Sequence, residues 1–114
     1  MSSSRCTGWW EQASMGRHKM EGLTLLIDGD KISGGGYDII GMFTLEGTIS
    51  PDNDVNMIKH YLDSHRLLYK GEYDGSSLMH GIWLVGFDSG PWEIRFRTTN
   101  AEKQNAKLEM VKSL

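Results

Sequence analysis

The sequence predicts an all-β domain, a single eight-stranded antiparallel up-and-down barrel followed by a short C-terminal helix or tail. Strand-like runs alternate with turn signals along residues 54–85, the pattern of an antiparallel meander. The chain contains 14 glycines and only 2 prolines, and glycine in a strand-dense chain marks bulges, tight turns and barrel corners. Every connection is short enough to join sequence neighbours, and closure of the sheet removes exposed edges.

The length and the cysteine content indicate one domain and one type of compartment. A chain of 114 residues builds one core, and its single cysteine, Cys6, excludes an intramolecular disulfide. The lack of disulfides favours the cytoplasm, and no run is apolar enough for a signal peptide or a membrane span. A net charge of −3 gives no reason to expect a nucleic-acid partner, since such binding depends on neutralising phosphates. We therefore expect a cytoplasmic protein with no nucleic-acid or membrane partner.

Turn signals divide the chain into eight strand candidates. Residues 20–27 alternate apolar side chains at period two and end at Asp28-Gly29, a strong hairpin signal. Three consecutive glycines at 34–36 are typical of a bulge, a corner or a close approach to a ligand, and we interpret them as a corner. The strand candidates are residues 8–16, 20–27, 31–33, 39–49, 55–61, 66–73, 78–85 and 92–98.

The barrel is expected to span residues 8–99, with a flexible N-terminus at residues 1–7 and a short helix or tail at residues 100–114. Asn100 has the chemistry of an N-cap, and a thin apolar stripe follows it. The stripe consists of Leu108, Val111 and Leu114. A helix of this length is marginal in isolation, so it needs a surface to pack on.

Residues 66–73 show which side of the strands faces inward. Odd-numbered apolar and aromatic residues alternate there with charged residues at even positions. Ordinary hairpin loops carry the same parity into the neighbouring strands, which places Lys59 on the inward face. Residues 78–85 are apolar on both faces, so their register stays open by one residue, and a slip would turn Trp83 outward.

A lysine on an otherwise apolar inward face needs a partner, because burial alone favours the neutral amine. The candidate partners are Asp38, Glu46, Tyr61 and Tyr69. Two interpretations follow. Lys59 and the surrounding aromatic residues could hold an anionic or planar small molecule, or Lys59 could lie near a barrel mouth, extend to water and form an ordinary salt bridge.

Large aromatic side chains share the inward face with Lys59. An eight-stranded barrel is only just wide enough for one small ligand, so these rings fill most of it and leave at best a shallow pocket at the mouth. The residues that we assign to ligand binding are Lys59, Tyr61, Tyr69, Trp83, Phe43 and Trp10. The leading hypothesis is a barrel that binds a small anionic or aromatic ligand at its mouth.

The outward face of the strands between residues 55 and 85 is apolar where a solvated barrel is expected to be polar. The residues of this predicted interface are Ile58, Leu68, Leu78, Ile82 and Leu84. Either the C-terminal tail covers this patch or a second subunit does. The alternative function is therefore a protein-interaction module with a filled core that forms a homodimer.

The start of the first strand resembles the Gly-x-Trp opening of calycin-type barrels, which are the lipocalins, fatty-acid-binding proteins and avidins. Here it reads Gly8-Trp9-Trp10. The lipocalin resemblance implies an arginine late in the last strand that stacks near the tryptophan, a part that Arg95 or Arg97 could fill. The avidin-like opening carries Gln12 and Gly16 where avidins have biotin-binding asparagine and serine. The resemblance thus implies the fold and no particular ligand.

Catalytic, metal and cofactor sites find little support in the sequence. The serines fall mainly at turns, and none lies in a nucleophile-elbow context. The four histidines are His18, His60, His65 and His80, and their spacing does not supply a third ligand for a metal ion. We therefore expect no enzyme activity, no metal and no cofactor.

Overall fold

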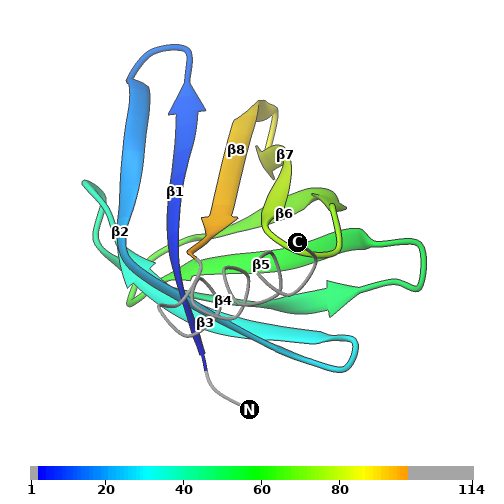
Figure 1. The fold of residues 1–114 in the computed structure, drawn as a ribbon. Helices are drawn as coiled ribbons and strands as arrows, with labels where there is room; N and C mark the ends of the chain where they lie inside the picture. The colour runs from blue at the N-terminus through cyan, green and yellow to red at the C-terminus, as the bar shows by residue number, and fades with distance from the viewer. Residues whose placement is uncertain (1–2, 98–114) are drawn as a thin grey trace, which may run out of the picture.

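The protein is a closed barrel of eight antiparallel strands in sequence order, and the computed structural model describes residues 3–97 (Figure 1). The strands are β1 (Ser4–Gln12), β2 (Gly16–Asp28), β3 (Lys31–Tyr37), β4 (Met42–Ile49), β5 (Asp54–Tyr61), β6 (Arg66–Tyr73), β7 (Leu78–Val85) and β8 (Asp88–Phe96). Each strand pairs with its neighbours in the chain, and pairing of β1 with β8 closes the barrel. This confirms the predicted all-β meander. The predicted C-terminal helix or tail, residues 100–114, lies outside the described residues.

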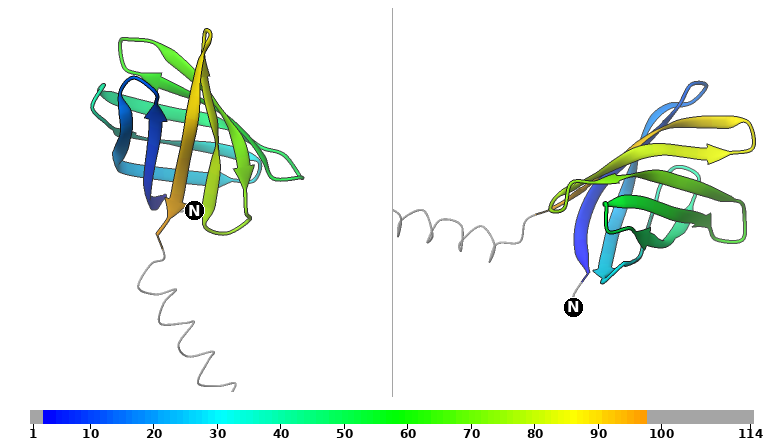
Figure 2. Two further views of the ribbon diagram at one scale, coloured as in Figure 1. Left: turned by 90° about the horizontal axis from the view of Figure 1, so that it is seen from above. Right: turned by 90° about the vertical axis from the view of Figure 1, so that its right-hand side faces the viewer.

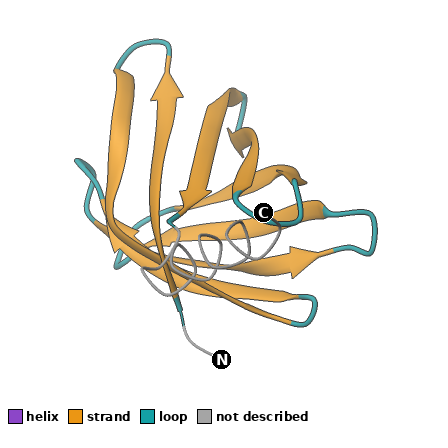
Figure 3. Ribbon diagram, viewed as in Figure 1, coloured by secondary structure: helices purple, strands orange, loops and turns teal. Residues whose placement is uncertain are grey.

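The sheet bends sharply as it closes. β1 and β8 run upright in Figure 1, whereas β3, β4 and β5 cross below them, and the views in Figure 2 show the same coiling. The long strand β2 turns this bend at a bulge, where the register with β3 shifts between Glu21 and Thr24 and Gly22 adopts a φ of 57°. Figure 3 shows strands joined by loops, with no helix among residues 3–97.

The glycine run at 34–36 lies inside β3 at this bend instead of interrupting the strand. A Cβ on Gly34 would run into the carbonyl oxygen of Thr24, and one on Gly36 would come within 2.7 Å of the Glu21 carbonyl oxygen. The backbones of β2 and β3 approach too closely there for any side chain. The corner interpretation is therefore correct about the bend, although the strand continues through it.

Several strand boundaries differ from those predicted. β1 begins at Ser4 instead of residue 8, because Cys6 is buried and pairs with Phe96 of β8. Two residues of the stretch predicted as a flexible N-terminus (residues 1–7), Cys6 and Thr7, therefore contribute to the ladder that closes the barrel. β4 begins at Met42 because residues 38–41 form a loop with its own hydrogen bond, from the Asp38 amide to the Gly41 carbonyl (3.0 Å).

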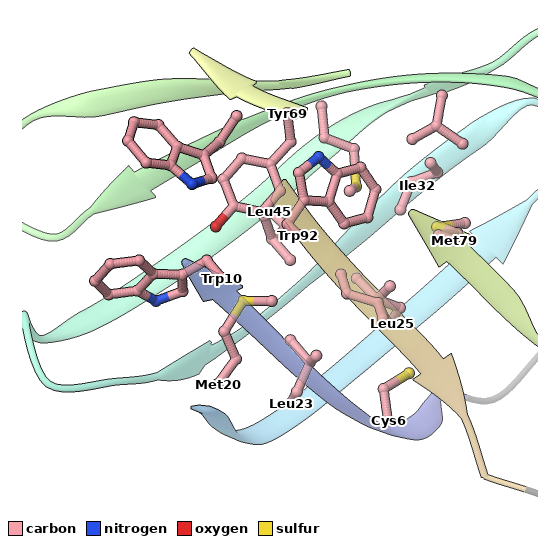
Figure 4. Packing of buried hydrophobic residues seen from close by; sticks show 14 of the residues in the cluster. Cys6, Trp10, Met20, Leu23, Leu25, Ile32, Leu45, Tyr69, Met79 and Trp92 are labelled. Carbon is pink, nitrogen blue, oxygen red and sulfur yellow. The ribbon is translucent and has the colours of Figure 1, made fainter. Parts of the chain in front are cut away.

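The inward parity predicted for the strands gives the observed core, part of which Figure 4 shows. Tyr69 pairs with Trp83, which settles the register of β7 and leaves Trp83 buried in the barrel. Tyr69 stacks on Trp92 with ring centroids 5.1 Å apart. Val85, two residues beyond Trp83 on the same parity, lines the mouth pocket but is 37% exposed, because β7 ends there at the rim.

Candidate functional site

A small pocket opens at one end of the barrel. Antiparallel pairing brings the ends of β1, β5 and β7 to the same rim as the start of β6. The pocket has a volume of about 80 Å³ and is lined by Trp10, Gln12, Ile40, Tyr61, His65, Leu67, Tyr69, Trp83 and Val85. Ligand pockets commonly measure about 300–1,000 Å³, so this one accommodates only one end of a molecule. The interior is therefore largely filled, with the shallow mouth pocket that the aromatic content predicted.

A buried ion pair lies beside this pocket. The Lys59 ammonium donates to Asp38 Oδ2 at 2.8 Å, and neither side chain is exposed to solvent. The same carboxylate oxygen accepts from the Tyr61 hydroxyl at 2.7 Å and from Trp10 Nε1 at 3.1 Å. Lys59 also donates to the Tyr69 hydroxyl at 3.1 Å. Four of the six predicted ligand-site residues thus belong to one hydrogen-bonded network with Asp38. They are Trp10, Lys59, Tyr61 and Tyr69.

Two of the partners proposed for Lys59, Asp38 and Tyr69, bond to it directly, and Tyr61 joins the network through Asp38. Glu46 does not take part, because it faces outward on β4 and is exposed. The interpretation in which Lys59 extends to water is wrong, since its ammonium is fully enclosed.

Aromatic rings surround the Lys59 ammonium. Its nitrogen lies 4.2 Å from the centroid of Phe43, 4.8 Å from that of Tyr61, 5.3 Å from that of Tyr69 and 5.6 Å from that of Trp10. Cation–π attraction at such distances stabilises an ammonium whose water has been removed. Phe43 and Trp10 therefore stabilise the charged ammonium of Lys59, and Trp10 also lines the pocket.

The protonation states follow from burial and pairing. Burial lowers the pKa of Lys59 from 10.5 to about 8, against the opposing effect of the Asp38 carboxylate, so the amine is charged at neutral pH. Burial acts to raise the pKa of Asp38, but the hydrogen bond and charge of Lys59 outweigh it and hold that pKa below 3.8. Burial raises the pKa of both Tyr61 and Tyr69, so their hydroxyls remain protonated donors.

Trp83 forms a wall of the pocket and ties two strands together. Its indole nitrogen donates to the Glu11 carbonyl of β1 at 3.0 Å. His65 lies at the rim, with its ring centroid 5.1 Å from that of Tyr61. Sequence reasoning did not assign the lining residues His65, Ile40 and Gln12, because they lie in loops or at strand ends where alternation carries no signal.

The predicted interface residues all face outward, and the structure brings four of the five together. Ile58 pairs with Leu68, and Leu68 pairs with Leu84, so the three form one row across β5, β6 and β7. Ile82 lies one step along β7 from Leu84. Leu78 lies at the other end of that strand, opposite Arg95 of β8.

A groove of about 750 Å³ continues this outer surface from Ile58 toward β2. Its lining is mixed, with charged residues of both signs beside the apolar ones. The lining residues are Leu26, Asp28, Lys31, Ile32, Ser33, Thr44, Glu46, Gly47, Thr48, Ile58, His60 and Arg66.

Within residues 3–97, no group of three or more His, Cys, Asp or Glu side chains is placed to hold a metal ion. In the same part of the chain, no helix has the length and apolarity needed to cross a bilayer. No family model, curated protein or solved structure matches the chain.

Proposed function

We propose that this barrel binds a small molecule with a planar, aromatic end at the mouth pocket. The observation that carries the proposal is the pocket itself, which is open at the rim and bounded by Trp10, Tyr61, Tyr69 and Trp83. Aromatic walls favour a flat ring, which they contact by stacking or edge-on. The volume of about 80 Å³ means that the rest of the ligand extends past the rim.

One polar group of the pocket has hydrogen-bonding capacity to spare. Among the described residues, the Tyr69 hydroxyl accepts a hydrogen bond from Lys59 and donates none. A ligand oxygen or ring nitrogen would accept a hydrogen bond from the Tyr69 hydroxyl. The Lys59 charge is already matched by Asp38, so the pocket in this form favours a neutral aromatic group over an anion.

The proposed role is binding and not catalysis, because the ionisable groups beside the pocket satisfy one another. The eight-stranded antiparallel layout is consistent with a calycin-like barrel, a fold that encloses small ligands in its mouth. We also propose a cytoplasmic location from the single cysteine.

Indole N–H resonances provide the test, because two of the four tryptophans line the pocket and two do not. Titration with benzamide, a planar probe with an acceptor oxygen, should shift the signals of Trp10 and Trp83. The signals of Trp9, on the outer surface beside Arg17, and of Trp92 should stay in place. Equal shifts at all four indoles, or none at any, would overturn the proposal.

A matched pair of variants tests the role of the hydroxyl. Tyr69→Phe removes the free donor of the pocket, whereas Tyr73→Phe makes the same change in the same strand, outside the pocket lining. A hydrogen bond contributes about 1 kcal/mol, so Tyr69→Phe should weaken benzamide binding about fivefold. Tyr73→Phe should leave the affinity unchanged.

A second candidate function is homodimerisation through the outer face of β5 to β7, with the filled core serving only as a scaffold. The contiguous row of Ile58, Leu68 and Leu84 favours it, because cross-strand apolar neighbours form one continuous patch. Light scattering on the wild type and on Ile82→Glu would test this candidate. A dimer that the charge converts to a monomer supports it, and a wild-type monomer excludes it.

A further inference from the structure

The loop between β3 and β4 turns one carboxylate into the barrel. Asp38 has no exposed side-chain surface, yet the next two residues, Ile39 and Ile40, are 67% and 43% exposed. Ile40 also contributes to the rim of the mouth pocket. Residues 38–41 therefore lie at the mouth with one acid directed inward and apolar side chains directed outward.

This loop is fastened to the barrel through a single oxygen atom. In the described part of the chain, the side-chain hydrogen bonds from the loop to the barrel wall all reach Asp38 Oδ2, from Lys59, Tyr61 and Trp10. Oδ1 instead accepts from the Ile40 amide at 2.9 Å, inside the loop. The Asp38 amide donates to the Gly41 carbonyl, which is also inside the loop.

The three donors belong to the barrel and not to the loop. Lys59 and Tyr61 project from β5, and Trp10 projects from β1, so the rigid wall positions them. Together they present an ammonium, a phenol and an indole N–H to one carboxylate oxygen, and charge-assisted bonds of this kind are strong. The arrangement is a carboxylate-binding site that the chain fills with its own side chain.

We propose that Lys59, Tyr61 and Trp10 form a binding site for the carboxylate of a small molecule, which Asp38 occupies until the 38–41 loop swings outward. The inference extends the proposed function, because the aromatic part of the same ligand would rest in the mouth pocket. The loop acts as a tethered competitor for the site. Its displacement would add the space beneath Ile40 to the pocket.

Charge balance couples the withdrawal of Asp38 to the binding of the ligand carboxylate. Withdrawal of Asp38 alone would leave the Lys59 charge buried without a partner, a costly arrangement. An incoming carboxylate removes that cost, so opening of the loop requires the ligand. A tethered acid also has a high effective concentration, so simple carboxylates should bind weakly to the wild type unless a ring adds contacts in the mouth pocket.

The variant Asp38→Ala removes the tethered competitor and vacates the site. Formate should then raise its melting temperature by roughly 5 °C for each tenfold increase in concentration beyond half-saturation. Sodium chloride at the same ionic strength and neutral acetamide are the controls, and neither should have this effect. A folded Asp38→Ala that responds no more to formate than to these controls would overturn the proposal.

The double variant Asp38→Ala/Lys59→Met tests whether the rise requires the ammonium. It should show no response to formate, because the charged donor is gone. A rise equal to that of Asp38→Ala would contradict the assigned site.

Ligand-induced shifts of resonances in the wild type test the proposal without any variant, so the result does not depend on how well a variant folds. Benzoate should shift the amide resonances of Ile39 and Ile40 as well as the Trp83 indole, because its carboxylate displaces the loop. Benzamide should shift the Trp10 and Trp83 indoles, which line the pocket, and leave the Ile39 amide in place. If benzoate shifts Trp83 without moving the loop amides, the mouth pocket binds rings but the carboxylate exchange is wrong. If neither probe shifts Trp83, the proposed function itself fails.

Discussion

The ion pair between Lys59 and Asp38 is the feature on which the site depends at the scale of single residues. Its two side chains are completely buried, and loss of one partner leaves the other as an uncompensated charge. We predict that Lys59→Met lowers the free energy of unfolding by about 3–5 kcal/mol. The double variant Lys59→Met/Asp38→Asn should recover part of this loss in urea denaturation.

An exposed pair of the same kind serves as the control. Arg17 and Glu11 lie 3.2 Å apart with side chains 56% and 41% exposed, so solvent screens their attraction. The double-mutant cycle with Arg17→Met and Glu11→Gln should give a coupling below about 1 kcal/mol. Equal coupling energies for the two pairs would contradict the role assigned to burial.

The stability of the protein in acid should depend on the Asp38 carboxylate. The pKa of Asp38 is held below 3.8 in the folded protein, so its contribution to stability is present above that pH and disappears as the pH falls through the folded value. Asp74 behaves likewise, because the Ser76, Ser77 and Leu78 amides lower its pKa.

The free energy of unfolding of the wild type should therefore fall steeply as the pH is lowered from roughly 5 to roughly 2. The slope should be reduced in Asp38→Asn and, independently, in Asp74→Asn. An unchanged slope in Asp38→Asn would show that the folded protein does not hold this acid in its charged form.

Sequence reasoning placed Lys59 correctly, since strict alternation along β5 leaves one cation among inward apolar residues. It offered several partners without choosing among them. Asp38 lies in a loop, where no period fixes the direction of a side chain, and only the folded chain shows that it turns inward. The hydrogen bond from Trp10 to the same Asp38 oxygen could not be predicted either, because it depends on how β1 faces β5 across the barrel.

At the scale of strands, a pair of facing glycines lets two backbones approach closely beside the buried Trp92 ring. Gly71 and Gly81 lie opposite each other on β6 and β7. A Cβ on Gly81 would meet the Lys70 carbonyl oxygen, and one on Gly71 would come within 2.9 Å of the Trp92 ring. These two strands therefore approach closely beneath the stacked rings of Trp92 and Tyr69.

We predict that Gly81→Ala destabilises the barrel by about 3 kcal/mol, because the added methyl group forces two backbones apart. Gly29→Ala is the control, since no heavy atom lies within 4 Å of the new methyl group and only its φ of 63° opposes the change. That strain costs about 1 kcal/mol. Urea denaturation midpoints measure both, and similar losses in the two variants would contradict the packing explanation.

The strands themselves were predictable where alternation or turn chemistry is strong. The hairpin at Asp28-Gly29 and the alternation of β6 are examples. Strand ends were less predictable, because hydrogen bonding to a distant partner decides them. Cys6 and Thr7 join β1 because β8 lies beside them, and Ser4 and Arg5 extend the strand by pairing with β2. The pairing of β1 with β8 joins the two ends of the barrel, and no local pattern encodes it.

At the scale of the whole molecule, closure of the barrel separates two surfaces, and each supports a different proposed function. The mouth of the barrel contains the pocket, with the buried ion pair beside it. The outer face of β5 to β7 carries the apolar row of Ile58, Leu68 and Leu84. The order of the strands and the inward parity could be predicted from the sequence. The small size of the pocket depends on how completely the side chains fill the interior, which parity does not determine.

Native mass spectrometry on protein purified without denaturation decides most directly between these surfaces, because one spectrum records both the number of subunits and any retained small molecule. The binding barrel predicts a monomer that carries an added small mass, retained in Tyr73→Phe and lost or weakened in Tyr69→Phe. A clean dimer without added mass, converted to a monomer by Ile82→Glu, would contradict it and assign the function to the outer face.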